Sequence, residues 1–222
     1  MKRSFLTFLV YALCISGFSQ KYFEGIVEYD LTIQSLNPGI SEKMLKQSYG
    51  TRVKFYHKDG NYIREYLTDE GNTLHKFIYL AKNNRLYRSD WSNPDTIFYD
   101  DASERHVKKY QIAKGSGDTV LDCICPSRII SYDYYEKMIS DTVHVNTEYF
   151  FCHQLAINPE YYKEYFIWYD VIKVEKSVAI KFVEESENYF KLTYTATKIN
   201  NVILPKETFD IDKNAVLKRK AF

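Results

Sequence analysis

The stretch Gly25-Ile26-Val27-Glu28-Tyr29-Asp30-Leu31-Thr32-Ile33 alternates apolar and polar side chains. Its odd positions from 27 to 33 are apolar, and its even positions from 28 to 32 are polar. Successive side chains of a strand point to opposite faces, so this pattern is typical of an antiparallel strand with one buried and one solvated face. The stretch therefore predicts a β-sheet that covers an apolar core.

Runs of the same character follow at spacings of about ten residues, each bounded by turn residues. Asp59-Gly60 is a strong hairpin signal between two of them. Strands are expected at residues 52–57, 62–67, 73–80, 85–88, 96–99, 119–131, 148–151, 178–184, 189–199 and 202–211. This succession predicts a mostly β chain with few helices, built as an antiparallel up-and-down sheet.

Two segments favour helices. Residues 41–49 are expected to form a short helix that is capped near Ser41 and ends at Gly50. A second helix is expected to begin at Asn158-Pro159, with Asn as the N-cap and Pro at the first position. Its aromatic residues are Tyr161, Tyr162, Tyr165, Phe166, Trp168 and Tyr169. They predict a helix that packs against the sheet, with a lid over an apolar cavity as the functional alternative.

The composition excludes several classes of protein. The chain of 222 residues holds 21 Tyr and 14 Phe, a density of aromatic residues that suits a folded β-rich domain and excludes a disordered chain. Its 30 basic and 29 acidic residues are balanced, whereas a nucleic-acid-binding protein needs a concentrated basic face. We expect one domain over residues 20–222, without a transmembrane segment in the mature chain and without a cofactor.

The N-terminus has the layout of a secretory signal peptide. Lys2 and Arg3 precede an apolar run at residues 5–15, and Gly17 and Ser19 fit the small-residue positions of a cleavage site. Residues 1–19 are therefore predicted to be removed, which makes the protein periplasmic or secreted, with association with the outer membrane as a further alternative. An uncleaved anchor and acylation at Cys14 are the other interpretations of this segment.

Three cysteines remain after cleavage, namely Cys123, Cys125 and Cys152. Cys123 and Cys125 are two residues apart and face the same way on a strand, so the expected disulfide joins Cys152 to one of them. The alternative is a zinc site of the three cysteines with His153, but these spacings are not those of zinc fingers. We therefore expect a disulfide, one free thiol and no metal.

Four stretches carry a resemblance to a known family: residues 23–29, 120–125, 155–159, and 192–199 with 202–205. They resemble exported proteins of unknown function that are common in Bacteroidota and related to the GLPGLI-type family. Asp122 stands where that family usually has Gly, and the signature that names the family is absent. The resemblance implies a LolA/LolB-like fold, as in lipoprotein carriers, with the sheet curled into an incomplete barrel and helices across its open face.

No G-x-S-x-G or H-E-x-x-H motif is present, and Glu184, Glu185 and Glu187 bracket an expected turn and are interpreted as solvated. The leading hypothesis is a non-enzymatic exported protein that binds a lipid or other apolar ligand in a half-barrel groove. The residues expected to line and close this groove are Val27, Tyr29, Leu31, Tyr161, Tyr165, Phe166 and Trp168. The alternatives are an envelope structural or protein-interaction module with a self-filled core, and an enzyme of unrecognised type.

Overall fold

The computed structural model describes residues 22–90, 92–93, 95–104, 107, 109–136 and 141–219. The predicted signal peptide, with Cys14, lies outside these residues. Within them the chain is mostly β, and it has two α-helices, α2 (Glu42–Tyr49) and α3 (Trp168–Glu175). None of the helices in this described part is long and apolar enough to cross a membrane.

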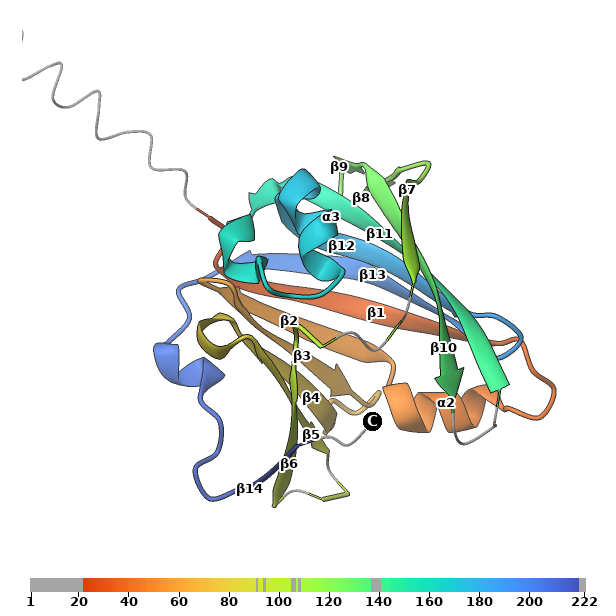
Figure 1. Cartoon of the computed structure of the whole chain (residues 1–222), viewed down its shortest axis with the longest axis horizontal. Helices are drawn as coiled ribbons and strands as arrows, with labels where there is room; N and C mark the ends of the chain where they lie inside the picture. Colours follow the sequence, from red (N-terminus) through yellow and green to blue (C-terminus); the bar gives the residue numbers. More distant parts are fainter. Residues whose placement is uncertain are drawn as a thin grey trace, which may run out of the picture.

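One large sheet dominates the described part of the chain (Figure 1). Its twelve strands are β1 (Gly25–Ser35), β2 (Arg52–Lys58), β3 (Asn61–Leu67), β4 (Thr73–Leu80), β5 (Arg85–Asp90), β6 (Thr96–Asp101), β7 (Tyr110–Lys114), β10 (Ser127–Glu136), β11 (Asp141–Ala156), β12 (Ser177–Ser186), β13 (Phe190–Asn201) and β14 (Val216–Arg219). Their order is β14-β6-β5-β4-β3-β2-β1-β13-β12-β11-β10-β7, so β1 lies at the centre. Neighbouring strands are antiparallel except for the parallel pair of β14 and β6, which confirms the predicted antiparallel sheet.

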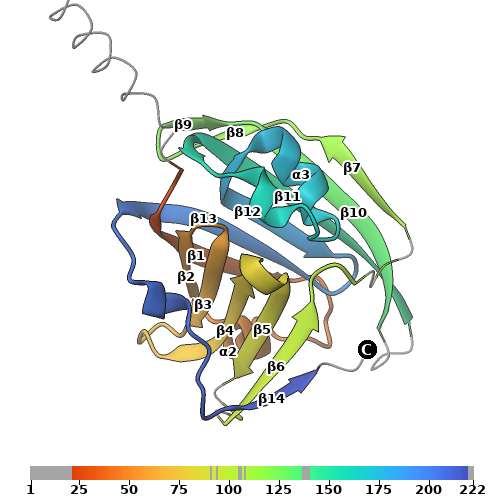
Figure 2. The ribbon, with the colours of Figure 1, turned by 60° about the vertical axis from the view of Figure 1, so that its left-hand side comes forward.

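The alternation in β1 sets the two faces of the sheet. Val27, Tyr29, Leu31 and Ile33 are buried on one face, as predicted, whereas Asp30 and Thr32 are exposed on the other. We call the face that carries Val27 and Tyr29 the inner face, because the larger apolar core packs on it. Val171 and Ile172 of α3 belong to this core, and Figure 2 shows α3 lying over the sheet.

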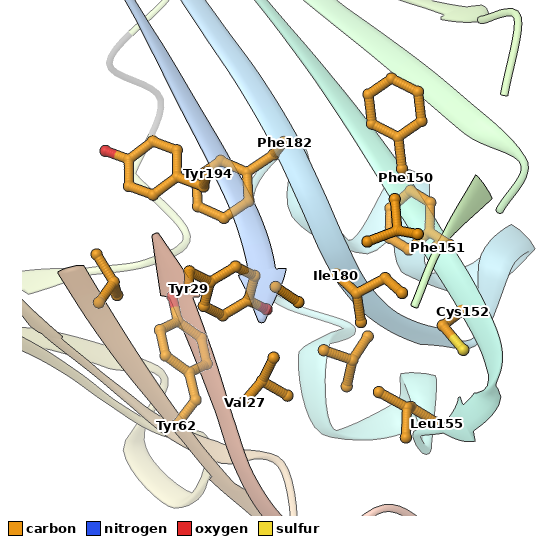
Figure 3. Close-up of a cluster of buried hydrophobic side chains, with 14 of the residues drawn as sticks. Val27, Tyr29, Tyr62, Phe150, Phe151, Cys152, Leu155, Ile180, Phe182 and Tyr194 are labelled. Carbon is orange, nitrogen blue, oxygen red and sulfur yellow. The ribbon is translucent and has the colours of Figure 1, made fainter. Parts of the chain in front are cut away.

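Aromatic side chains fill much of the inner face. Figure 3 shows Tyr29, Phe182 and Tyr194 close together on β1, β12 and β13. The rings of Phe182 and Tyr194 stack with their centroids 3.9 Å apart, and Tyr29 meets Phe182 edge to face at 5.9 Å. Each fully buried side chain of this size contributes about 1.5–3 kcal/mol to folding, so this cluster is a principal source of stability.

A second, smaller core lies on the outer face. Ile63, Ile78, Tyr87 and Ile97 of β3–β6 pack there against Leu204 and Phe209. The prediction of a strand at residues 202–211 is wrong, because this segment contains the 3₁₀-helix η3 (Lys206–Phe209) and covers the outer face. Pro205 precedes η3 and has no N–H to donate to a strand partner, which agrees with this outcome.

The predicted long strand at residues 119–131 is also wrong. Leu121 and Asp122 have φ values of 46° and 60° and form a tight turn, which splits the segment into the hairpin of β8 (Asp118–Val120) and β9 (Cys123–Cys125). β10 then begins after Pro126. The turn has no Gly, so the sequence offers no strong signal for it. β11 is much longer than the predicted 148–151, since it continues on both sides of that run.

The first helix was predicted correctly, whereas the second was not. In α2 the Ser41 hydroxyl accepts a hydrogen bond from the Met44 N–H, and the helix ends at Gly50. Asn158 caps only a 3₁₀-turn, η2 (Pro159–Tyr162), and α3 begins six residues after it. Ile167 has a φ of 65° directly before α3, which is outside the helical region and separates the two elements.

Candidate functional site

The aromatic segment, which we define as residues 159–170, lies on the inner face and is fixed by hydrogen bonds to the sheet. The hydroxyls of Tyr62 in β3 and Tyr165 are 2.9 Å apart. The Tyr79 hydroxyl donates to the Tyr161 carbonyl at 3.1 Å, and the Phe166 N–H donates to the Ala102 carbonyl at 2.8 Å. These contacts hold the segment in an irregular conformation, whereas the sequence predicted a continuous helix.

His57 of β2 is buried beneath this segment. Its Nδ1 lies 2.8 Å from the Phe23 carbonyl and its Nε2 lies 3.0 Å from the Tyr162 hydroxyl. The carbonyl can only accept, so Nδ1 carries the proton and Nε2 accepts from Tyr162. Burial lowers the pKa of His57 from 6.5 to about 4, which keeps the ring neutral at neutral pH. His57 is therefore a structural link between β2 and the aromatic segment.

The predicted groove wall is part of the packed core. Val27, Tyr29 and Leu31 are 0%, 3% and 6% exposed. Tyr29 borders a cavity with a volume of about 30 Å³, which is room for about two water molecules. This cavity is too small for a chain-like ligand.

A larger pocket of about 250 Å³ opens next to this cavity. Three of the predicted lid residues, Tyr165, Phe166 and Trp168, line one side of it. The sheet provides the opposite side through Tyr62, Arg64, Ile130, Tyr132, Thr147, Tyr149 and Glu184. Tyr161, the fourth predicted lid residue, lines a different pocket, with Asp59 and Lys82. The structure thus brings three of the seven predicted groove residues together around one space.

The pocket combines aromatic walls with two ionisable side chains. The guanidinium of Arg64 lies over the rings of Tyr62 and Phe182, with distances of 5.7 Å and 5.2 Å to their centroids. Burial raises the pKa of Glu184, and the positive charge of Arg64 only partly offsets this effect. Burial also raises the pKa of Tyr149 to about 12, so its hydroxyl is neutral at physiological pH. The pocket can therefore receive a molecule with both apolar and charged parts.

Arg64 and Glu184 are pocket residues that the sequence did not predict. No local signal marks Arg64, because both faces of β3 carry buried apolar residues, Tyr62 and Tyr66 on one and Ile63 and Leu67 on the other. Glu184 lies within β12 and faces the same inner pocket, so its interpretation as a solvated turn residue is wrong. A charged residue at an inward position of a strand is unusual and marks a candidate site.

The disulfide joins Cys123 of β9 to Cys152 of β11, with their Cα atoms 6.1 Å apart. Cys125 is free and 1% exposed, and burial raises the pKa of its thiol. The disulfide contains two of the three cysteines that the alternative zinc site would need as thiolate ligands. His153 instead lies 3.3 Å from the Glu175 carboxylate, and the described residues contain no cluster that would hold a metal ion.

No protein-family model matches the chain, and no curated protein matches its sequence. Among solved structures, one of PNGF-II in space group P21 is similar to 88% of this chain, with 10% sequence identity and a TM-score of 0.44. The similar region covers 32% of that protein, so this chain spans about a third of its length. A likeness this distant carries no argument about the site or its activity.

Proposed function

We propose that this chain is an exported, non-enzymatic binding protein that takes a lipid or another apolar or amphipathic molecule at the inner face of its sheet. The observation that carries this proposal is the pocket of about 250 Å³ between the aromatic segment and the sheet. Small-molecule sites usually have volumes of about 300–1,000 Å³ and mainly apolar walls with a few polar groups. The pocket has such walls and lies just below this range, which suits a single short chain.

We further propose that the sheet is an incomplete barrel of the LolA/LolB type, and that the chain belongs with the exported Bacteroidota proteins related to the GLPGLI-type family. Two features support this. The terminal strands of the sheet order, β14 and β7, are not hydrogen-bonded to each other within the described residues. The aromatic segment and α3 both pack with the inner core, where helices would cover an open side.

Export is supported by the disulfide and by the signal-like N-terminus. Disulfides persist in oxidising compartments such as the periplasm and the cell exterior. The Cys123–Cys152 bridge is therefore compatible with a periplasmic or secreted protein. A ligand would then come from the cell envelope or its surroundings, and a lipid of the envelope is the simplest source.

Binding would involve the aromatic segment as a movable cover. Each hydrogen bond that fixes it contributes about 0.5–1.5 kcal/mol, so a ligand that buries one short chain could replace several of them. Trp168 and Phe166 would pack on the apolar part of the ligand.

The fluorescence of Trp168 offers a direct test. A fatty acid with a bromine on its chain quenches a tryptophan that it touches, so titration of the mature protein should reduce the emission of Trp168 in a saturable way. The chain has one other tryptophan, Trp91, and the Trp168→Phe variant therefore measures the background. Quenching that is equal in both proteins, or absent from both, would refute binding in this pocket.

A second candidate function is an envelope interaction module with a self-filled core. The cavity of about 30 Å³ beside Tyr29 favours it, since the core leaves little free space there. Ile203 and Ile124 are also 84% and 83% exposed and offer apolar contacts to a protein partner. Under this alternative the brominated fatty acid leaves Trp168 unaffected, and the Ile203→Asp variant loses a partner that co-purifies with the wild type.

A further inference from the structure

Arg64 occupies an inward position on β3. Strand alternation places it on the inner face between Tyr62 and Tyr66, and it pairs with Phe55 and Phe77 on the neighbouring strands. Its side chain borders both the cavity of about 30 Å³ and the pocket of about 250 Å³. The positive charge of Arg64 therefore lies at the boundary between the packed core and the open pocket.

No carboxylate among the described residues forms an ion pair with Arg64. Its partners are the rings of Tyr62 and Phe182 and the hydroxyl of Tyr66. Burial raises the pKa values of the surrounding tyrosines, Tyr149 among them, so none of them supplies a negative charge at neutral pH. Buried charges in proteins are usually paired, because removal of an ion from water is costly.

We propose that Arg64 binds the anionic group of the ligand, and that the ligand is a single-chain amphiphile headed by a carboxylate or a phosphate. A planar guanidinium donates two parallel hydrogen bonds to either group. The apolar chain would lie against Trp168, Phe166 and Ile130, which line the same pocket. This inference rests on the proposed function, because it names the class of molecule that the same pocket binds.

Glu184 is the acidic group in this pocket. It makes no ion pair with Arg64, and burial favours its uncharged form. A neutral carboxyl group can donate a hydrogen bond to the head group of the ligand, whereas a carboxylate would repel it. The Glu184→Gln variant also presents an uncharged hydrogen-bond donor, so its affinity for an anionic ligand should not fall below that of the wild type.

The test compares decanoate, decyl phosphate and 1-decanol, which share a ten-carbon chain and differ in the charge of the head group. Binding is measured by isothermal titration calorimetry below the critical micelle concentration. A hydrogen bond to a charged group changes an affinity by about tenfold or more, so at least one anion should bind about tenfold more tightly than decanol. The anion that binds with the higher affinity shows whether the site prefers a carboxylate or a phosphate head group.

The Arg64→Gln variant should bind decanol like the wild type and lose the preference for the anion. The Arg64→Lys variant keeps the charge and should keep part of that preference. Circular dichroism of both variants checks that they fold. Equal binding of all three probes by the wild type, or an unchanged preference in folded Arg64→Gln, would overturn the role of Arg64 while leaving the proposed function intact. Failure of the wild type to bind any of the probes would refute both.

Discussion

The hydroxyls of Tyr62 and Tyr165 lie 2.9 Å apart, and this contact joins the middle of the sheet to the aromatic segment. The ring of Tyr165 also lies against that of Tyr79, with 4.9 Å between the centroids. Tyr165 also lines the pocket of about 250 Å³. The ring of Tyr165 therefore belongs to the core, and its hydroxyl group fixes the position of the pocket wall.

The Tyr165→Phe variant should be less stable than the wild type. It removes the hydrogen bond and leaves the buried Tyr62 hydroxyl without this partner, which costs about 1–3 kcal/mol. Urea unfolding followed by circular dichroism measures the loss. Tyr161→Phe is the matched control, because Tyr161 is 39% exposed. Equal stability of the two variants would show that the Tyr62–Tyr165 contact does not hold the segment.

Gly60 should tolerate no side chain, because it lies directly under the aromatic segment. Its φ is 77°, and an added Cβ atom would lie 2.3 Å from the Cβ atom of Tyr161. Gly71 has a φ of 89°, but its nearest neighbour would be the flexible end of Arg52 at 3.5 Å. Both alanine variants share the backbone strain, so Gly60→Ala should be more destabilised than Gly71→Ala by at least about 1 kcal/mol. Equal unfolding midpoints would contradict this contact.

His57 should make the protein less stable in acid. Burial lowers its folded pKa to about 4, below the value of 6.5 in the unfolded chain. Between these two values the unfolded state binds a proton that the folded state excludes, so stability falls by up to about 3 kcal/mol as the pH drops from 6.5 to 4. The His57→Gln variant should show a shallower fall in its free energy of unfolding over this range.

His144 is the control for this experiment. It is a partly exposed residue whose pKa is raised by its hydrogen bond to Asp133. A raised pKa contributes stability that is present at low pH and lost as the pH rises through the folded value. The His144→Gln variant should therefore not reduce the acid sensitivity. A fall in stability of the same size in His57→Gln and the wild type would refute the role of His57.

The cysteines predict a defined thiol count for a chain that begins at Gln20, after removal of the proposed signal peptide. A thiol reagent should find no accessible thiol in the native protein and one in denaturant, because Cys125 is buried and the other two are bridged. The Cys125→Ala variant should show none in either state. Loss of the bridge in Cys152→Ser should cost about 2–4 kcal/mol in stability. A thiol that persists in denatured Cys125→Ala would show that the bridge is not formed.

Local signals in the sequence were sufficient for β1–β6 and α2. The alternation at residues 27–33 and the Asp59-Gly60 turn both appear in the structure, since each depends on neighbouring residues alone. The second helix was missed for a tertiary reason. Asn158 and Pro159 form a real helix start, but the backbone hydrogen bond from Phe166 to Ala102 draws the chain out of a helical path.

The candidate site was only partly predictable. The aromatic composition of the segment gave Tyr165, Phe166 and Trp168 as pocket residues, but no local pattern shows which strands face them. Arg64 shares one face of β3 with Tyr62 and Tyr66, but the other face is buried as well, so the sequence does not show which face points inward. The proximity of Arg64 to Glu184 could not be predicted from the sequence. Their strands, β3 and β12, are separated by β2, β1 and β13 in the sheet and by more than a hundred residues in the chain.

Native mass spectrometry tests the central claim of ligand binding most directly. The mature protein is purified without detergent from a host that exports it, and its mass is compared before and after extraction with organic solvent. We predict a bound molecule in the mass range of lipids that disappears on extraction, and a new complex when decanoate is added to the extracted protein. A single ligand-free mass in all three samples would contradict the account and favour the self-filled interaction module.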